Sequence, residues 1–467
     1  MALQDLSAHD LIAGYKSGEF SPVEATQAVL AQIDRWEPHI AATYLLRPEA
    51  ALEQARASEA RWLKGQPCGA LDGVPVTIKD NIATQGDPVP LGTKATTLTP
   101  APADAPPAAR VREAGAVIVS KTTMPDYGML SSGLSTFHAI SRNPWDTTRT
   151  PGGSSAGAGA AAAAGYGPLH LGTDIGGSIR LPAGWCGTVG LKPSLGRVPI
   201  DPPYMGRAAG PITRTTADAA LLMQVLSRPD PRDSMALPPQ AIDWSLVWRQ
   251  DKPLKGLRIG LHLDAGCGLP VDAAIRTAVE HAGHLFEAQG AVVTVMAPFM
   301  TPELLAGLDY FWRMRSMLDI DALTDEARDG VLPVIREWAD SARGMSGPEV
   351  FRAFSATHAT RVATQMALQP FDYVLSPTSP VGPALFDWAS PTNDPLRGLE
   401  HIGFTVPYNM GEQPAVSVNG GYADAGNGKL WPIGLQIAGQ RFDDLGLLQM
   451  ARAFEQLRGP QQAWPSP

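Results

Sequence analysis

The sequence predicts an α/β fold, in which strands and helices follow one another along the chain. Residues 73–79 alternate between apolar and polar side chains, as a strand with one buried face does. A helix is expected over 108–114, Gly115 ends it, and the apolar run 116–119 follows as a short buried strand. This order of helix, glycine and strand is typical of α/β proteins.

The remaining elements extend this pattern over the whole chain. Ser21-Pro22-Val23-Glu24 is a capping box with proline at the first helical position, and it begins a helix that continues to Trp36. Residues 300–370 are expected to be mostly helical. Further helices are expected over 49–64, 216–226, 271–289 and 443–457, and further strands over 257–261, 291–295, 372–375, 415–418 and 433–437. We find no internal repeat and no clear boundary, so one domain is expected over residues 1–467.

Composition excludes several classes of protein. The net charge is −9 and no basic patch stands out, so no nucleic-acid partner is expected. No run of about 18 apolar residues occurs, so no membrane span is expected. The first residues lack the features of a signal peptide, which makes the cytoplasm the expected location. The chain has three cysteines, which lie far apart: Cys68, Cys186 and Cys267. This argues against a disulfide framework and against a zinc ribbon.

Three segments carry residues capable of chemistry: Lys79-Asp80-Asn81, Pro151-Gly152-Gly153-Ser154-Ser155, and the run 172–183 that contains Gly176-Gly177-Ser178. Each segment alone has an ordinary structural interpretation. Lys79 fits a solvated side chain after a strand. Ser154 and Ser155 fit the cap of the alanine-rich helix that follows, and Gly176-Gly177-Ser178 fits a tight turn. Gly, Ala and Ser dominate residues 151–196 with apolar residues between them, which favours closely packed backbones over a flexible linker.

Together, the three segments closely resemble the amidase signature. Ser154 lies 24 residues before Ser178, and Lys79 ends an upstream strand, as in that family. Further segments resemble the family at 186–194, 210–214, 411–415 and 432–436. The resemblance is strong over 60–225 and fainter over 370–457, whereas 227–365 falls outside it. The resemblance implies a single α/β/α domain built around a large mixed twisted sheet.

The resemblance also implies a catalytic triad, with Ser178 as nucleophile, Ser154 as proton bridge and Lys79 as base. A serine hydroxyl is a weak nucleophile and needs a base. Lysine is normally charged at neutral pH, but burial disfavours the charged form and can lower its pKa by several units. No metal or organic cofactor is expected for this chemistry.

The glycines before the second serine are expected to shape an oxyanion hole. Backbone N–H groups of Ile175, Gly176, Gly177 and Ser178 would converge on the oxyanion, as the family resemblance implies. Asp174 and Arg180 flank this loop with opposite charges and are interpreted as its structural support, with substrate contact as the other role open to them.

The chain departs from the family pattern at one place, where Ala156 stands instead of the glycine that often follows the first serine pair. Alanine is small, so we expect the geometry to survive.

Other motif interpretations are weaker. Gly153-Ser154-Ser155-Ala156-Gly157 fits the α/β-hydrolase elbow, with Ser155 as nucleophile and Asp372 and His401 following in the right order, but no apolar strand precedes it. The stretch 157–162 fits a loose dinucleotide pattern and has the same defect. His281 and His284 lie three apart on an expected helix without a further ligand cluster.

The sequence therefore predicts a hydrolase that cleaves the C–N bond of an amide or carbamate. The proline-rich segment 198–205 and the aromatic residues 310–312 suggest an apolar or aryl substrate. A small molecule is the expected partner, and a monomer or homodimer the expected state. The alternative is the amidase subunit of a glutamyl-tRNA amidotransferase, which shares the signature and releases ammonia from glutamine inside a complex. A binding protein that has lost activity is disfavoured because all three triad residues are present.

Overall fold

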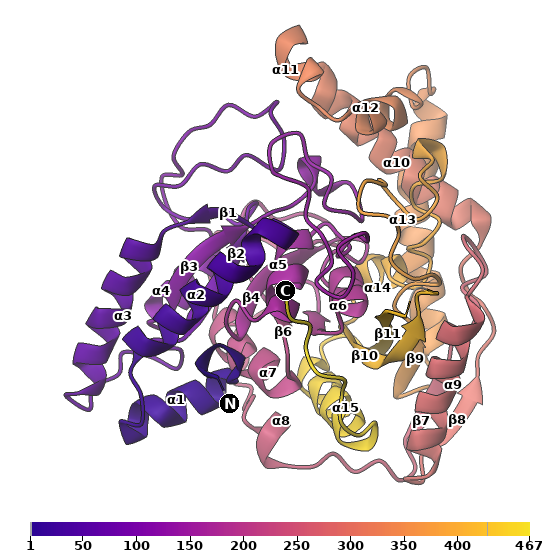
Figure 1. Ribbon diagram of the computed structural model, residues 1–467. Helices are drawn as coiled ribbons and strands as arrows, with labels where there is room; N and C mark the ends of the chain where they lie inside the picture. Colours follow the sequence, from indigo (N-terminus) through magenta and orange to yellow (C-terminus); the bar gives the residue numbers. More distant parts are fainter. Residues whose placement is uncertain (1, 427) are drawn as a thin grey trace.

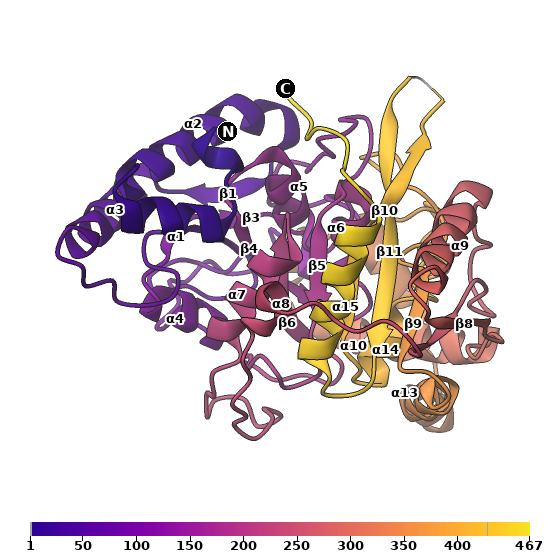
Figure 2. The ribbon, with the colours of Figure 1, turned by 90° about the horizontal axis from the view of Figure 1, so that it is seen from below.

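The computed structural model describes residues 2–426 and 428–467 and is built around one 11-stranded mixed sheet. Figure 1 shows the sheet crossing the molecule, and Figure 2 shows it from below. The strand order is β1-β3-β2-β4-β6-β5-β10-β11-β9-β7-β8. The strands are β1 (Thr43–Leu46), β2 (Pro75–Lys79), β3 (Val117–Thr122), β4 (Leu169–Asp174), β5 (Val189–Lys192), β6 (Ala208–Thr213), β7 (Arg258–Leu261), β8 (Val292–Val295), β9 (Tyr373–Pro377), β10 (Ala415–Asp424) and β11 (Leu430–Gly439).

Helices cover both faces of this sheet, so the predicted α/β/α architecture with a large mixed sheet is confirmed. The capping box predicted at Ser21 and Glu24 is present and begins α2. The helices are α1 (Ala8–Ser17), α2 (Pro22–Ile40), α3 (Pro48–Trp62), α4 (Pro106–Glu113), α5 (Ala156–Ala164), α6 (Arg180–Cys186), α7 (Thr216–Leu226), α8 (Leu246–Arg249), α9 (Ala273–Glu287), α10 (Pro302–Asp321), α11 (Asp325–Asp329), α12 (Pro333–Asp340), α13 (Gly347–Leu368), α14 (Val406–Met410) and α15 (Asp444–Leu457).

Strand β2 lies in the interior of the sheet, parallel to both β3 and β4. All five of its residues are buried, because helices cover both of its faces. Proline in a sheet is usually found at the start of a strand or on an edge strand. Pro75 is the first residue of β2, which is not an edge strand. Since β2 and β4 are parallel, their carboxyl ends meet at the same edge of the sheet.

The region rich in Gly, Ala and Ser forms the centre of the molecule. Helix α5 is buried along its whole length, and its small residues allow neighbouring segments to approach closely. A Cβ atom on Gly157 would lie 2.2 Å from the Ala42 carbonyl oxygen, and one on Gly159 would lie 2.7 Å from Cβ of Pro182. Ala156, at the first helical position, is fully buried, so this departure from the family pattern is accommodated in the core.

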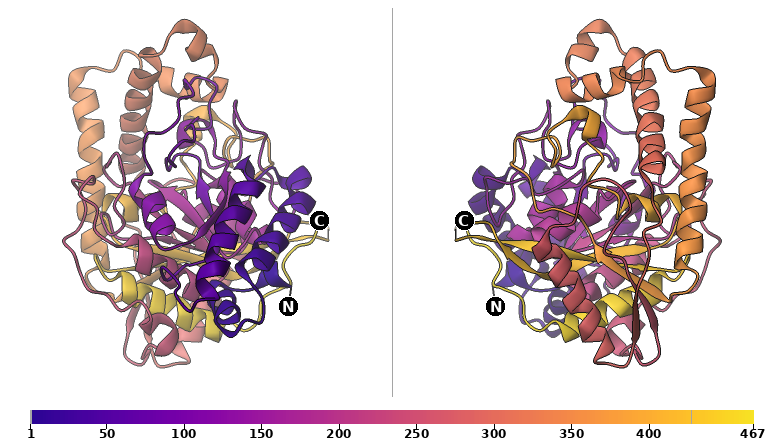
Figure 3. Two further views of the ribbon diagram at one scale, coloured as in Figure 1. Left: turned by 90° about the vertical axis from the view of Figure 1, so that its left-hand side faces the viewer. Right: turned by 90° about the vertical axis from the view of Figure 1, so that its right-hand side faces the viewer.

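Helices α10, α12 and α13 form a separate layer that rises beside the sheet edge carrying the ends of β2 and β4 (Figures 1 and 3). This layer is the expected helical region 300–370. Its apolar side chains form a hydrophobic cluster with residues of α6 and α14, among them Leu181 and Val406. In the part of the chain that the structure describes, no helix combines the length and apolarity needed to cross a bilayer.

Candidate active site

The predicted site residues converge where β2 and β4 end and where α5 and α6 begin. Lys79 is the last residue of β2, Ser154 lies just before α5, and Ser178 lies between β4 and α6. The fold thus brings together three segments that are far apart in the sequence. Such an edge, at the carboxyl ends of parallel strands, is where α/β proteins commonly bind ligands.

Lys79 is fully buried, and its ammonium group has two hydroxyl partners. Its Nζ donates to Ser154 Oγ and to Thr173 Oγ1, both at 2.9 Å. Burial lowers the pKa of Lys79 to about 7, although the nearby carboxylates of Asp174 and Asp80 act in the opposite direction. A lysine with such a pKa is partly neutral at physiological pH and can accept a proton.

Thr173 is a site residue that the sequence did not single out. Its hydroxyl accepts from Lys79 Nζ and, at 3.1 Å, from the side-chain amide of Asn81. The threonine lies next to last in β4, so it reaches Lys79 only because β2 and β4 are neighbours in the sheet. A strand prediction over 169–174, placed beside 75–79, would have been the signal that identifies it.

The two serine segments are held together by backbone and side-chain hydrogen bonds. The Ser155 N–H donates to the Ser178 carbonyl at 3.1 Å, and the Gly153–Ser154 peptide bond is cis. Ser155 Oγ donates to the Thr173 carbonyl at 3.2 Å and is itself fully buried, so it faces away from the cavity. Ser155 occupies the cap position of α5 but makes no side-chain capping bond.

The elbow interpretation fails on this geometry. No strand leads into Ser155, and its hydroxyl is enclosed. Asp372 pairs with Arg258 on the surface, and His401 is buried beside Trp185, so neither carries out the role that an α/β-hydrolase triad requires. Among the described residues, no group of three or more His, Cys, Asp or Glu side chains has metal-binding geometry, His281 and His284 included.

The loop 175–178 turns its backbone toward the cavity. In the described residues the N–H groups of Ile175, Gly176 and Ser178 donate no hydrogen bond within the protein. The Gly177 N–H is different, because it donates to Asp174 Oδ1 at 2.9 Å. Three of the four expected oxyanion donors are therefore unpaired, whereas the fourth already has an acceptor. Gly177 has a φ of +133°, a conformation that only glycine adopts readily.

A fully buried ion pair lies directly beneath this loop. Asp174 accepts from the Ile179 N–H at 3.1 Å in addition to the Gly177 N–H, and Arg180 Nη2 donates to Asp174 Oδ1 at 2.9 Å. The Arg180 guanidinium beside Asp174 holds the pKa of that carboxyl well below its usual range, against the effect of burial. Arg180 also reaches residues of the C-terminal half, with contacts at 2.6–2.9 Å to Asn409 Oδ1, Gln436 Oε1 and the Thr405 carbonyl.

Ser178 opens into an apolar cavity, called here the inner lobe. Trp312 from α10 lines it, whereas Tyr310 points to solvent and Phe311 packs on Phe354, so only one of the three suggested aromatic residues reaches the site. The inner lobe is lined mainly by apolar side chains and glycines: Gly128, Met129, Leu130, Ile175, Gly176, Leu181, Trp312, Trp338, Leu399 and Ile402. The polar members of the lining are Ser131, Ser178 and Arg315.

Comparison with known proteins identifies the family. The Amidase family model matches residues 24–448, which is most of the chain. The chain belongs to the amidase-signature family. This membership supports hydrolysis of an amide C–N bond.

Individual members of the amidase-signature family resemble the chain over nearly its full length. A glutamyl-tRNA(Gln) amidotransferase subunit from Myxococcus xanthus is 37% identical, over 97% of this chain and 98% of that protein. A bacterial aryl acylamidase structure superposes with a TM-score of 0.87 at 29% identity, covering 97% of this chain and 96% of the other. The structure of a 6-aminohexanoate cyclic dimer hydrolase superposes with a TM-score of 0.86 at 26% identity, covering 98% of this chain and 97% of the other.

Replacing Arg180 with Met tests how the loop of this amidase-family protein is held. The substitution leaves Asp174 as a buried charge without its cation, so we expect a loss of about 3–5 kcal/mol in the free energy of unfolding. Urea denaturation followed by circular dichroism measures this loss. Arg258→Ala, which removes an exposed arginine from another Asp pair, is the control and should leave the midpoint almost unchanged. Equal midpoints for the two variants would contradict the assigned importance of the buried pair.

Proposed function

We propose that this protein is a stand-alone amidase that hydrolyses small apolar amides, aryl amides in particular, through an acyl-enzyme on Ser178. The observation that carries the proposal is the buried Lys79 whose Nζ lies 2.9 Å from Ser154 Oγ. The next residue, Ser155, donates its N–H to the carbonyl of Ser178, and Ser178 faces an apolar cavity. A neutral lysine in contact with a second hydroxyl is a base that can act at a distance from the nucleophile.

The first half-reaction forms an ester. Ser178 Oγ attacks the substrate carbonyl carbon while its proton passes to Ser154 Oγ, and the Ser154 proton passes to Lys79 Nζ. The tetrahedral intermediate collapses when the leaving nitrogen takes a proton back through the same relay, which breaks the C–N bond and releases the amine. Water then attacks the acyl-enzyme with the same relay as base, and the carboxylic acid leaves.

The oxyanion is stabilised by the backbone of the loop. The unpaired N–H groups of Ile175, Gly176 and Ser178 supply donors that are already oriented before the reaction. The Gly177 N–H has a different role in this proposal, since its bond to Asp174 fixes the loop shape. Asp174 and Arg180 act as structural support and not as substrate contacts, because both side chains are fully buried.

The cavity favours an apolar substrate. Trp312, Trp338 and aliphatic side chains make up most of the inner lobe, and burying apolar substrate surface against them contributes roughly 25 cal/mol per Å². A carbamate has the same acyl carbon and nitrogen leaving group as an amide, so an aryl carbamate would be processed by the same groups. We therefore include carbamate hydrolysis, a urethanase activity, in the proposal.

The alternative is a role as the amidase subunit of a glutamyl-tRNA amidotransferase, and the 37% identity to the Myxococcus xanthus protein supports it. In that case the chain would act on glutamine inside a complex and not as a monomer or homodimer. Glutamine carries a carboxylate and an ammonium group next to its side chain. Among the described residues that line the inner lobe, Arg315 is the one charged side chain, so an acidic partner for the ammonium group is missing there. This chemistry favours the stand-alone amidase.

Labelling with a fluorophosphonate tests the nucleophile. We expect one labelled peptide, modified at Ser178, because this serine faces the cavity. Ser178→Ala should abolish labelling and lower kcat by at least about a thousandfold, whereas Ser155→Ala, the matched control, should still be labelled. Modification of Ser155 in peptide mapping by mass spectrometry would refute the mechanism.

Substrate competition tests the class of amide. We expect the purified protein to hydrolyse acetanilide or an aryl carbamate with a higher kcat/KM than acetamide, since the cavity rewards apolar surface. Product amines are measured by chromatography and ammonia by an enzyme-coupled assay. A clear preference for acetamide would reject the apolar substrate, and ammonia release from glutamine that requires a co-purified protein would establish the amidotransferase alternative.

The pH dependence of kcat/KM tests Lys79 as base. The base must be neutral, so kcat/KM for acetanilide should rise with pH and level off above an apparent pKa of about 7. Lys192 is the matched control, because burial also lowers its pKa to about 7. Lys192→Met should retain the acid limb of the profile, and Lys79→Ala should lose activity at every pH. If the acid limb disappears in Lys192→Met, the titrating group is Lys192, and the role of Lys79 as base is contradicted.

A further inference from the structure

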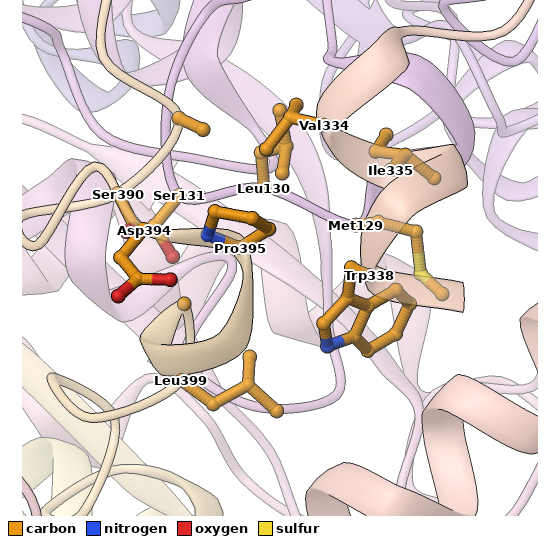
Figure 4. A pocket seen from close by; sticks show the side chains of 12 residues that line it. Met129, Leu130, Ser131, Val334, Ile335, Trp338, Ser390, Asp394, Pro395 and Leu399 are labelled. Carbon is orange, nitrogen blue, oxygen red and sulfur yellow. The ribbon is translucent and has the colours of Figure 1, made fainter. Parts of the chain in front are cut away.

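The cavity of this protein has a second compartment beyond the inner lobe. An outer lobe shares five lining residues with the inner lobe, so the two adjoin. Figure 4 shows that its walls come from α12, from the segment after Gly128 and from the loop around Pro395. The residues common to both lobes are Met129, Leu130, Ser131, Trp338 and Leu399.

The lining of the outer lobe is largely apolar. Val334 and Ile335 from α12 face Pro395 across the lobe, and Ser131, Ser390 and Asp394 form a polar margin on one side (Figure 4). Asp394 Oδ1 already accepts from the Leu396 N–H at 2.9 Å. The outer lobe is therefore suited to an uncharged apolar group, such as an alkyl chain or a second ring.

A partly buried network of hydrogen bonds fixes both walls of the outer lobe at the same time. Trp338 Nε1 donates to Asp309 Oδ1 at 2.8 Å, which holds the indole between the two lobes. Arg313 pairs with Asp309 and also donates to the Leu396 carbonyl at 2.8 Å. Helix α10 thus ties α12 to the loop that carries Pro395, so the lobe is preformed.

The position of Ser154 indicates which half of a substrate enters the outer lobe. Ser154 Oγ lies 3.2 Å from the point where a Cβ on Gly128 would stand, and Gly128 lines the inner lobe. From there the chain continues through Met129 to Ser131, which line both lobes. In the proposed mechanism Ser154 returns the proton to the leaving nitrogen. The amine half of the substrate therefore lies on the side that leads to the outer lobe.

We propose, on the basis of the proposed amidase function, that the outer lobe binds the distal part of the amine half, so that the preferred substrates are amides or carbamates of elongated apolar arylamines. The acyl group occupies the inner lobe near Trp312 and Ile402, and Trp338 lies at the passage between the two lobes.

The test compares acetanilide with 4-butylacetanilide, which is lengthened on the amine side, and with hexanoylanilide, which is lengthened on the acyl side. We expect kcat/KM for 4-butylacetanilide to exceed that for acetanilide by at least about tenfold. Val334→Trp, which fills only the outer lobe from a half-buried position, should remove this gain and leave acetanilide within about twofold of wild type.

Leu318→Trp is the matched control, because it adds the same side chain at an exposed position of α10 away from both lobes and should retain the gain. Thermal unfolding of both variants checks that the fold is intact. The proposal is overturned if 4-butylacetanilide keeps its gain in kcat/KM in the Val334→Trp variant. It is also overturned if only hexanoylanilide gains over acetanilide and Val334→Trp removes that gain.

Binding of the product amines separates this inference from the proposed function. Isothermal titration calorimetry with 4-butylaniline and aniline needs no turnover, and we expect tighter binding of 4-butylaniline that Val334→Trp abolishes and Leu318→Trp retains. If no anilide is hydrolysed but this binding pattern is found, the proposed function fails and the outer lobe stands. If anilides are hydrolysed and 4-butylaniline binds no better than aniline, the function stands and the outer-lobe proposal fails.

Discussion

The fully buried pair between Asp174 and Arg180 is the constraint on which the site depends. A buried ion pair adds little net stability, because removing two charges from water costs about as much as their attraction returns. Its effect here is on geometry. The carboxylate accepts N–H groups of Gly177 and Ile179, and the guanidinium fork binds three partners in the C-terminal half of the chain. One pair thereby fixes the loop before Ser178 and joins the two halves of the sheet.

This pair also influences the lysine at the centre of the site. Burial makes the charged form of Lys79 unfavourable, whereas the negative charge of Asp174 favours it. The positive charge of Arg207 acts in the same direction as burial and also disfavours the charged lysine. The result is a lysine whose pKa falls to about 7 although two carboxylates lie nearby. Asp174 thus takes part in both the geometry of the loop and the basicity of the lysine.

The parts of the fold that local patterns determine could be predicted from the sequence. The alternation over 73–79, the capping box at Ser21 and the amphipathic closing helix all correspond to observed elements. Strands β4, β5 and β6 were missed because their glycines and small residues give no alternating pattern, although they form the middle of the sheet. Their composition reflects close backbone contacts, which depend on the tertiary structure.

The candidate site divides in the same way. Lys79, Ser154 and Ser178 could be singled out because they lie in motifs, and the structure places all three at one edge of the sheet. Thr173 and Asn409 could not, since each reaches the site only through contacts between segments distant in sequence. The same holds for the cavity: only Trp312 among the suggested aromatic residues lines it.

The arrangement of the molecule separates chemistry from recognition. The groups proposed to react lie at the end of β2 and just before α5 and α6, and every residue of these three elements is buried. The outer lobe is bounded by α12 and the loop around Pro395, and both are fixed through side chains of α10. Because these walls are held by Asp309 and Arg313 and not by the sheet, changes in residues 300–400 can reshape the lobe while Lys79 keeps its burial and its partners. In the proposed function, α12 and the loop around Pro395 would therefore select the substrate together with residues 129–131, while the sheet supplies the reacting groups.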